Sequence, residues 1–229
     1  MNKSPFYIIG NWKSNKTVTE ASIWCQDFAT AWKKQKIDES KIKIVLCPSF
    51  IHLTTVRSLI ELSQVPIELG CQTISSTEMG AFTGEVAASM VSEFVRFVLI
   101  GHSERRTYQK ETETELLAKV VQAKAAGIEP IYCVQNSEQS IPPQCMMVAY
   151  EPVWAIGTGK ADTPQNANEV AAVIKQKATR PLTIIYGGSV TAANIAGYAA
   201  TEHINGVLPG GASLTATTFV ELIANVSSV

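Results

Sequence analysis

The sequence of 229 residues lacks several features that would assign it to a specialised class of protein. No apolar run approaches the roughly 20 residues that a transmembrane helix requires. Basic and acidic residues almost cancel, at 19 and 20, and the formal net charge of −1 gives no global attraction to nucleic acid or to acidic membranes. The apolar run near the N-terminus soon meets Asn11 and Lys13, unlike a signal peptide. We therefore expect a cytoplasmic protein with no membrane or nucleic-acid partner.

Cysteine is also scarce, and its spacing fits neither a disulfide framework nor a zinc site. The five cysteines are odd in number and form no CxxC pair. Several lie in apolar, strand-like runs, so we expect buried free thiols in a reducing compartment. The sequence has no strand–helix GxGxxG motif and no cluster of metal ligands, and we expect no cofactor and no metal. The cysteines are Cys25, Cys47, Cys71, Cys133 and Cys145.

The sequence does contain a repeated alternation of strand-like and helical segments. Hydrophobic residues make up 46% of the chain, and no linker or low-complexity tract divides residues 1–229, so we expect one domain with a sizeable core. Short apolar, β-prone runs lie at 6–9, 42–47, 67–71, 97–100, 131–134, 146–150, 182–186 and 204–208. Eight parallel strands with helices between them close into a (β/α)8 barrel, whose chemistry lies at the carboxyl ends of the strands.

Helix signals stand between these runs. Thr17 with Glu20, and Thr112 with Glu115, have the spacing of a capping box. Gly127 is well placed to end the second of these helices, which we expect over residues 113–126.

An aromatic stripe follows the first capping box. Trp24, Phe28 and Trp32 recur every four residues and therefore share one helix face. We interpret this stripe as core packing and not as a cofactor site.

Polar residues and glycine pairs gather where the predicted strands end. They are Asn11, Lys13, Gln72, His102, Glu151, Ser189 and the glycines at 187–188 and 210–211. Because the carboxyl ends of barrel strands meet at one mouth, this pattern predicts a single site.

The stretch over residues 146–160 carries the most informative of these signals. An apolar strand ends at Glu151 and Pro152, and a segment closed by Gly157-Thr158-Gly159 follows. A carboxylate at a strand end, beside a loop able to close over it and exclude water, is suited to act as a general base. Glu151 by itself is better interpreted as an acidic residue that caps a strand before an ordinary loop, and it is the whole stretch that favours the general base.

Six motifs in order resemble those of triosephosphate isomerase. They are GNWKSN (10–15), GAFTGE (80–85), GHSERR (101–106), YEPVWAIGTGK (150–160), YGGSV (186–190) and LPGGASL (208–214). The resemblance covers nearly the whole chain. It implies a TIM barrel that interconverts dihydroxyacetone phosphate and glyceraldehyde 3-phosphate through an enediolate, in glycolysis and gluconeogenesis.

The resemblance also implies roles for the residues at the mouth. Glu151 is the family's proton-transferring glutamate, and His102 is a neutral imidazole that donates a hydrogen bond to the substrate oxygens; that pair of roles is a worked example in general accounts of the enzyme. Lys13 supplies a fixed positive charge, and Asn11 contacts the substrate.

Phosphate binding is assigned to glycine-rich turns. Gly157, Ser189, Gly210 and Gly211 match the family's phosphate contacts, and barrels commonly build such a site from the loops after strands seven and eight. Supporting roles fall to Glu104, which pairs with Lys13, and to Ser103 and Tyr186.

A long loop over residues 73–84 suggests a partner, because loops of this length usually carry function. In the family it docks into the neighbouring subunit, with Thr83 reaching the neighbour's site, and Glu85 pairs with Arg105. The resemblance therefore implies a homodimer. From the residues alone, a flexible loop on a monomer is an open alternative.

The sequence departs from the family in the connection between strands five and six. Residues 135–145 are close to the lower limit for a parallel crossover, and they contain Pro142-Pro143, which oppose a helix. We predict that the helix here is absent or reduced to a turn. The link over residues 178–181 is also short. The family's CIGE reads Cys133-Val134-Gln135-Asn136, so the glutamate that supports the lid is missing.

Two further departures are Pro209, which removes a backbone N–H before the phosphate glycines, and Ser14, which replaces a usual methionine.

The departures from the family leave two alternative functions open. One is a phosphate-binding or partner-binding barrel that is catalytically weak or inactive. The other is an isomerase for a different phosphorylated sugar, although the lid and both glycine turns favour the small triose.

Overall fold

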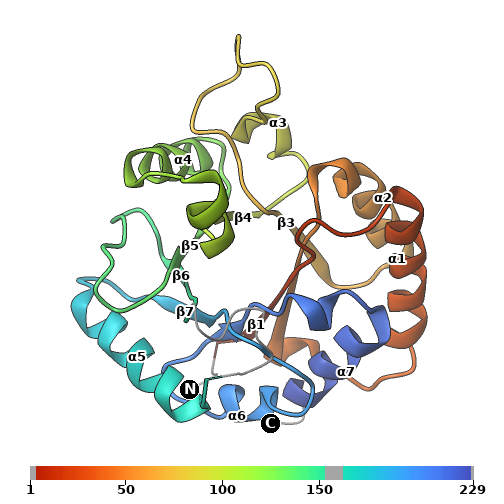
Figure 1. Ribbon diagram of the computed structural model, residues 1–229. Coiled ribbons are helices and arrows are strands. Elements are labelled where there is room, and N and C mark those ends of the chain that lie inside the picture. Colours follow the sequence, from red (N-terminus) through yellow and green to blue (C-terminus); the bar gives the residue numbers. More distant parts are fainter. Residues whose placement is uncertain (1–3, 153–161, 228–229) are drawn as a thin grey trace.

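The computed structural model describes residues 4–152 and 162–227, and its strands form one closed parallel barrel in sequence order (Figure 1). The strands are β1 (Phe6–Asn11), β2 (Ile42–Cys47), β3 (Ile67–Cys71), β4 (Phe97–Ile100), β5 (Glu129–Val134), β6 (Met147–Tyr150), β7 (Thr183–Tyr186) and β8 (Gly206–Val207). The predicted (β/α)8 fold is confirmed. β8 is shorter than the expected run, although the N–H groups of Asn205 and Leu208 on either side of it also donate to β7.

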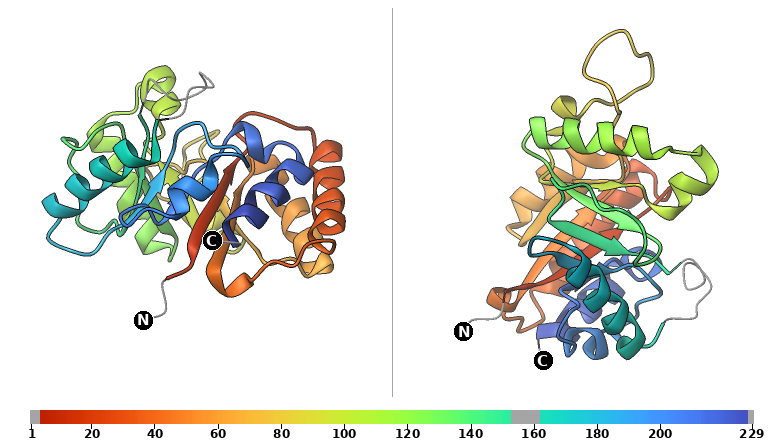
Figure 2. Two further views of the ribbon diagram at one scale, coloured as in Figure 1. Left: turned by 90° about the horizontal axis from the view of Figure 1, so that it is seen from below. Right: turned by 90° about the vertical axis from the view of Figure 1, so that its left-hand side faces the viewer.

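Helices surround the barrel, as the views along and across its axis show (Figures 1 and 2). They are α1 (Val18–Trp32), α2 (Leu53–Ser63), α3 (Ala88–Val91), α4 (Glu113–Ala125), α5 (Pro164–Lys177), α6 (Ile195–Ala199) and α7 (Ala216–Ser227). Short helical turns are η1 (Glu39–Lys41), η2 (Phe50–His52), η3 (Arg105–Gln109) and η5 (Gly211–Ser213). Among the described residues, no helix is long and apolar enough to cross a membrane.

The expected helix caps are present. Thr17 accepts a hydrogen bond from the Glu20 N–H, and the Glu20 side chain accepts one from the Thr17 N–H, which completes a capping box at the start of α1. Thr112 and Glu115 form the same reciprocal pair at the start of α4. Gly127 follows α4 with φ of +71°, a left-handed conformation that glycine adopts without strain.

The core has two layers because alternate residues of each strand face opposite sides of the sheet. The inner layer fills the barrel with Ile9, Val45, Cys47, Phe97, Leu99, Ile131, Cys133, Met147, Ala149, Ile185 and Leu208. The outer layer lies between strands and helices and includes the predicted aromatic stripe of α1. All five cysteines are buried free thiols, as expected.

The connection between β5 and β6 contains turns and no helix, which confirms the predicted loss. The Cys145 N–H donates to the Pro142 carbonyl at 3.0 Å, and Ile141 packs against the outer core layer. Arg180, from the other shortened link, donates from Nη2 to the Pro142 carbonyl at 2.7 Å and from Nε to the Cys145 carbonyl at 3.1 Å. The two shortened connections therefore stabilise each other.

The loop over residues 73–84 projects away from the barrel beside α3 (Figures 1 and 2). Its tip exposes two large apolar side chains, Met79 at 66% and Phe82 at 49%. Its base is anchored, because Ile74 and Ser75 are buried and the Ser75 N–H donates to the Val86 carbonyl at 2.8 Å.

Candidate active site

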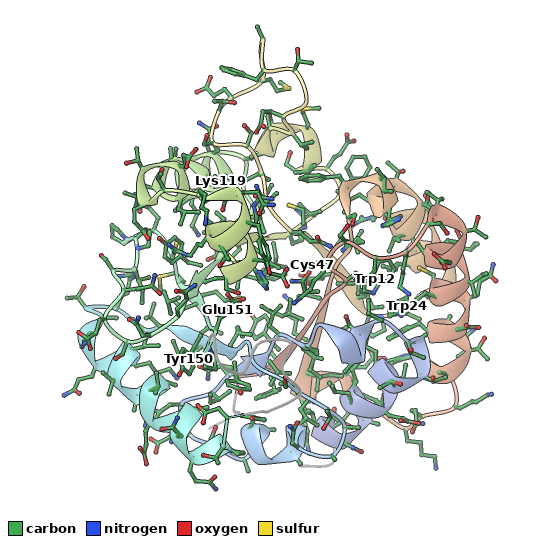
Figure 3. All side chains as sticks on the ribbon, viewed as in Figure 1. Trp12, Trp24, Cys47, Lys119, Tyr150 and Glu151 are labelled. Atoms are coloured by element: carbon green, nitrogen blue, oxygen red, sulfur yellow. The ribbon has the colours of Figure 1, made fainter. Side chains whose placement is uncertain are left out.

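Glu151 is the most buried ionisable group at the barrel mouth, with 1% of its side chain exposed, and it lies on the inner side of the ring just beyond β6 (Figure 3). Its Oε2 accepts a hydrogen bond from the Ser103 N–H at 2.8 Å. Its Oε1 lies 3.1 Å from His102 Nε2, but the two atoms form no hydrogen bond, and Oε1 has no donor among the described residues. Burial raises the pKa of this carboxyl, and the opposing effects of His102, Ser103 and Lys13 only reduce that rise.

His102 follows β4 and is held in one orientation by the turn that it begins. Its Nδ1 accepts a hydrogen bond from the Glu104 N–H at 3.2 Å, so this nitrogen carries no proton and the ring proton is assigned to Nε2. The proton-bearing nitrogen is thus the one that faces Glu151. This arrangement provides a hydrogen-bond donor at the mouth.

Lys13 has a positive φ of 55°, a conformation that non-glycine residues rarely adopt and that costs about 1–3 kcal/mol. Three contacts hold its backbone there. The Lys13 N–H donates to Asn11 Oδ1 at 3.0 Å, and the Lys13 carbonyl accepts from Gln72 Nε2 at 2.9 Å and from Ser49 Oγ at 3.2 Å. The Lys13 ammonium forms the expected ion pair with Glu104, at 2.6 Å.

A cavity of about 420 Å³ brings Lys13 and His102 together with the glycine-rich turns, whereas Glu151 lies behind its wall and does not line it. Its wall includes Asn11, Lys13, His102, Gly187, Gly188, Ser189, Gly210 and Gly211. Three of the four predicted phosphate contacts, Ser189, Gly210 and Gly211, therefore lie on the same cavity as the charged residues. The fourth, Gly157, lies outside the described residues, as does the rest of the predicted lid over 153–161.

The glycine pair after β7 has no room for side chains. A Cβ at Gly187 would lie 2.9 Å from Glu151 Cγ, and one at Gly188 would lie 2.1 Å from the Tyr186 hydroxyl oxygen. That hydroxyl accepts a hydrogen bond from the Asp162 N–H at 2.9 Å. Tyr186 thus anchors the chain directly after the predicted lid, and Gly187 leaves the space that the Glu151 side chain occupies.

A second cavity, of about 410 Å³, shares Asn11, Lys13 and His102 with the first and extends to Gln72, Thr73, Glu104, Arg105 and Tyr108. The residues of the predicted dimer loop lie elsewhere: Thr83 and Glu85 are exposed and line neither cavity. Within one chain, the expected pairing of Arg105 with Glu85 is not formed. The Arg105 Nε binds Glu111 Oε1 at 2.5 Å instead.

Sequence reasoning missed the ionic network around Glu111. Its Oε1 also accepts from Lys119 Nζ at 2.5 Å, and Lys119 Nζ donates to Thr73 Oγ1 at 2.9 Å, at the base of the long loop. Lys119 lies on α4 (Figure 3). The other buried residues of this helix are apolar: Leu116, Val120 and Ala123. A lysine on the apolar face of a helix is the one signal that could have revealed it, because buried lysine requires a partner.

The positions that depart from the family have local roles. Asn136 Oδ1 accepts from the N–H groups of Glu138 and Gln139, at 2.9 and 3.2 Å, so this oxygen is used within its own turn. The Pro209 carbonyl accepts from the Asn11 N–H at 3.0 Å and ties the end of β1 to the turn after β8.

This fold and this cluster define a class, the (β/α)8-barrel proteins with ionisable side chains and glycine turns at the carboxyl ends of the strands. The family model described as triosephosphate isomerase matches residues 6–144 and 141–226. The two parts meet inside the shortened β5–β6 connection. This chain belongs to the triosephosphate isomerase family.

Relatives named triosephosphate isomerase align with almost the whole chain. The protein of Leifsonia xyli is 36% identical over an alignment of 246 residues, gaps included, which covers 94% of this chain and 95% of the relative. That of Mesomycoplasma hyorhinis is 37% identical over 239 residues, or 94% and 96% of the two chains. That of Dehalococcoides mccartyi is 37% identical over 251 residues, or 97% of each.

Proposed function

We propose that this protein is a triosephosphate isomerase, which interconverts dihydroxyacetone phosphate and D-glyceraldehyde 3-phosphate. The observation that carries the proposal is the contact of the buried Glu151 carboxylate with His102 Nε2, at 3.1 Å, beside a cavity that Lys13 also lines. A base, a hydrogen-bond donor and a cation at one mouth are what proton transfer next to a carbonyl requires.

Glu151 takes the proton from the carbon next to the substrate carbonyl and returns it to the neighbouring carbon. Its Oε1 has no hydrogen-bond donor among the described residues and is the oxygen available as the base, while the Ser103 N–H holds Oε2. Burial makes the ionised carboxylate less stable than in water, so it is a stronger base.

His102 and Lys13 stabilise the negative charge that develops on the two oxygens of the enediolate. The His102 Nε2–H donates to these oxygens, and the hydrogen bond from the Glu104 N–H to Nδ1 keeps the ring proton on Nε2. The Lys13 ammonium adds a fixed charge, and its strained backbone is held by Asn11 and Gln72 so that the charge stays at the mouth. Asn11 also contacts the substrate.

The phosphate group of the substrate binds at the other end of the same cavity, against Ser189, Gly210 and Gly211. Backbone N–H groups in glycine turns are suited to an anion because no side chain blocks their approach. Closure of the segment that contains Gly157 would exclude water and protect the enediolate from loss of phosphate. The pathways served are glycolysis and gluconeogenesis, and we place the protein in the cytoplasm.

We also propose that the protein works as a homodimer. The second cavity lies beside Lys13 and His102, and the exposed loop over residues 73–84 projects from the same chain with apolar side chains at its tip. Insertion of that loop into the partner's cavity would bury Met79 and Phe82 and bring Thr83 to the partner's site.

A catalytically weak barrel is the second candidate, and the hydrogen bonds of Asn136 favour it. The oxygen that would support the lid in place of the missing glutamate is already used by Glu138 and Gln139. This would slow turnover through poorer lid closure without removing any reacting group.

A coupled assay of glyceraldehyde 3-phosphate isomerisation decides between the two. We expect robust turnover in the wild-type protein and a loss of about 10³-fold or more in Glu151→Ala, because removal of a general base typically costs about 10²–10⁴-fold. If the wild-type protein is folded but turns over no faster than the variant, the proposal that it is an isomerase is overturned.

A further inference from the structure

Two tryptophans donate to a single carbonyl next to the candidate phosphate site. Trp12 Nε1 lies 3.2 Å and Trp24 Nε1 lies 3.0 Å from the carbonyl oxygen of Ser213, the last residue of η5. One indole follows β1 and the other comes from α1, and Ser213 itself is fully buried. A carbonyl oxygen has two lone pairs, and both are used here.

The surrounding packing leaves these indoles little freedom. Trp24 makes an edge contact with Trp12 at 5.0 Å between ring centroids and stacks on Phe28 at 5.1 Å. Figure 3 shows the two tryptophans side by side, between the strands and α1. On the other side, a Cβ at Gly10 would lie 3.0 Å from Ser213 Cβ, so Ser213 packs directly against the backbone of β1.

The other carbonyls of this turn are fixed as well. The Gly210 carbonyl accepts from the Ser213 N–H at 2.9 Å and from Ser213 Oγ at 2.7 Å, and the Gly211 carbonyl accepts from the Leu214 N–H at 3.1 Å. The Leu214 carbonyl accepts from Lys16 Nζ at 2.7 Å, and the same ammonium lies over the Trp12 ring at 5.2 Å.

These bonds determine where two backbone donors point. A peptide group is planar, so fixing its carbonyl also fixes its N–H on the opposite side. The Gly210 carbonyl shares a peptide group with the Gly211 N–H, and the Gly211 carbonyl shares one with the Ala212 N–H. Neither N–H donates to an acceptor among the described residues, and both residues line the cavity of about 420 Å³.

We propose that Trp12, Trp24 and Lys16 are positioning residues that hold the Gly210–Leu214 turn so that its free N–H groups face the substrate phosphate. The indoles fix the Ser213 carbonyl, whose peptide group includes the Leu214 N–H, and that N–H in turn fixes the Gly211 carbonyl. This inference rests on the proposed function and deepens it, since it assigns part of the phosphate affinity to side chains that never touch the phosphate.

The test substitutes Trp24→Phe, which removes one donor and keeps an aromatic ring. Inorganic phosphate serves as a competitive inhibitor of the isomerase assay. We expect its inhibition constant, and the KM for glyceraldehyde 3-phosphate, to rise about five-fold, the factor for losing one neutral hydrogen bond. The matched control is Trp32→Phe, on the same helix, because the Trp32 indole N–H has no acceptor among the described residues. We expect that control to match the wild type.

A second substrate distinguishes a specific effect on phosphate binding from a general loss of activity. With unphosphorylated D-glyceraldehyde, Trp24→Phe should retain wild-type kcat/KM, because no phosphate is bound. Equal losses on both substrates, or an unchanged phosphate inhibition constant, would overturn the positioning role. Lys16→Met, which removes the donor to the Leu214 carbonyl, should raise the phosphate inhibition constant in the same way, and it provides the test if Trp24→Phe does not fold. Absence of isomerase activity in the wild type would instead overturn the proposed function.

Discussion

At the scale of single residues, the site depends on the surroundings of the buried Glu151 carboxylate. Glu151 is buried with one oxygen bound to the Ser103 N–H and the other without a donor among the described residues. An ionised carboxylate in that position is unfavourable for folding, which is a common feature of catalytic groups. The same environment that makes Glu151 a base therefore makes it a weak point for stability.

The sign of this effect predicts how Glu151→Gln changes stability with pH. The folded-state pKa is raised above the ordinary value of about 4.3, so the ionised group costs stability once the pH has risen through the folded pKa. At pH 8 we expect the variant to melt about 2–4 °C above the wild type, which corresponds to about 1 kcal/mol. Near pH 4 the two melting temperatures should converge. A variant less stable than the wild type at pH 8, in calorimetric scans, would contradict the raised pKa.

Gly187→Ala tests the space that the carboxylate needs. The added Cβ would approach Glu151 Cγ at 2.9 Å, so the side chain has to move. We expect kcat to fall by about 10²-fold, since a shift of about 1 Å in a catalytic group can cost that much. The melting temperature should fall as well, because the Cβ also meets the Tyr150 carbonyl oxygen at 3.2 Å. Steady-state kinetics with near-wild-type kcat would show that Glu151 tolerates the displacement.

At the scale of elements, the barrel tolerates the loss of one covering helix because a compact turn takes its place. Ile141 covers part of the outer core layer, and Arg180 satisfies the carbonyls of Pro142 and Cys145. The sequence predicted the lost helix from the short connection and its two prolines. It could not predict Arg180 as the residue that replaces the missing support, because that contact joins two segments far apart in the chain.

Arg180→Met tests that support. Removal of the guanidinium leaves the carbonyls of Pro142 and Cys145 without these donors, and we expect a loss of about 1–3 kcal/mol in the free energy of unfolding by urea. Arg57→Met is the matched control, because it removes an exposed pair with Glu61 on one helix that should contribute less than about 1 kcal/mol. Equal effects of the two substitutions would show that the turn is stable without Arg180.

At the scale of the whole molecule, local signals predicted the barrel well. Eight apolar runs, two capping boxes and Gly127 correspond to observed elements, and polar residues at strand ends converge on one mouth. Contacts between distant segments were harder to predict. Lys119 binds Thr73, and Trp24 binds the Ser213 carbonyl, across separations in the chain that no local sequence pattern reveals. The pairing of Arg105 with Glu85 was implied by the family resemblance, and within the chain Arg105 binds Glu111 instead.

The proposed dimer predicts the mass of the protein in solution. Sedimentation equilibrium should give twice the chain mass of 24.8 kDa for the wild type. Phe82→Glu puts a charge at the loop tip that we propose is buried, and it should shift the protein toward the single-chain mass. Leu62→Glu is the control, since Leu62 lies on α2 and is 81% exposed, and it should remain dimeric. A wild-type mass of one chain would contradict the dimer.

The most direct test of the central claim, that Glu151 transfers a carbon-bound proton, is the reaction in heavy water followed by proton NMR. A base that exchanges its proton with solvent, while the enediolate is bound, transfers deuterium to carbon in the product. We predict deuterium at the carbon next to the carbonyl in the wild-type product and none above background with Glu151→Gln. Undiminished incorporation of deuterium by the variant would contradict the account.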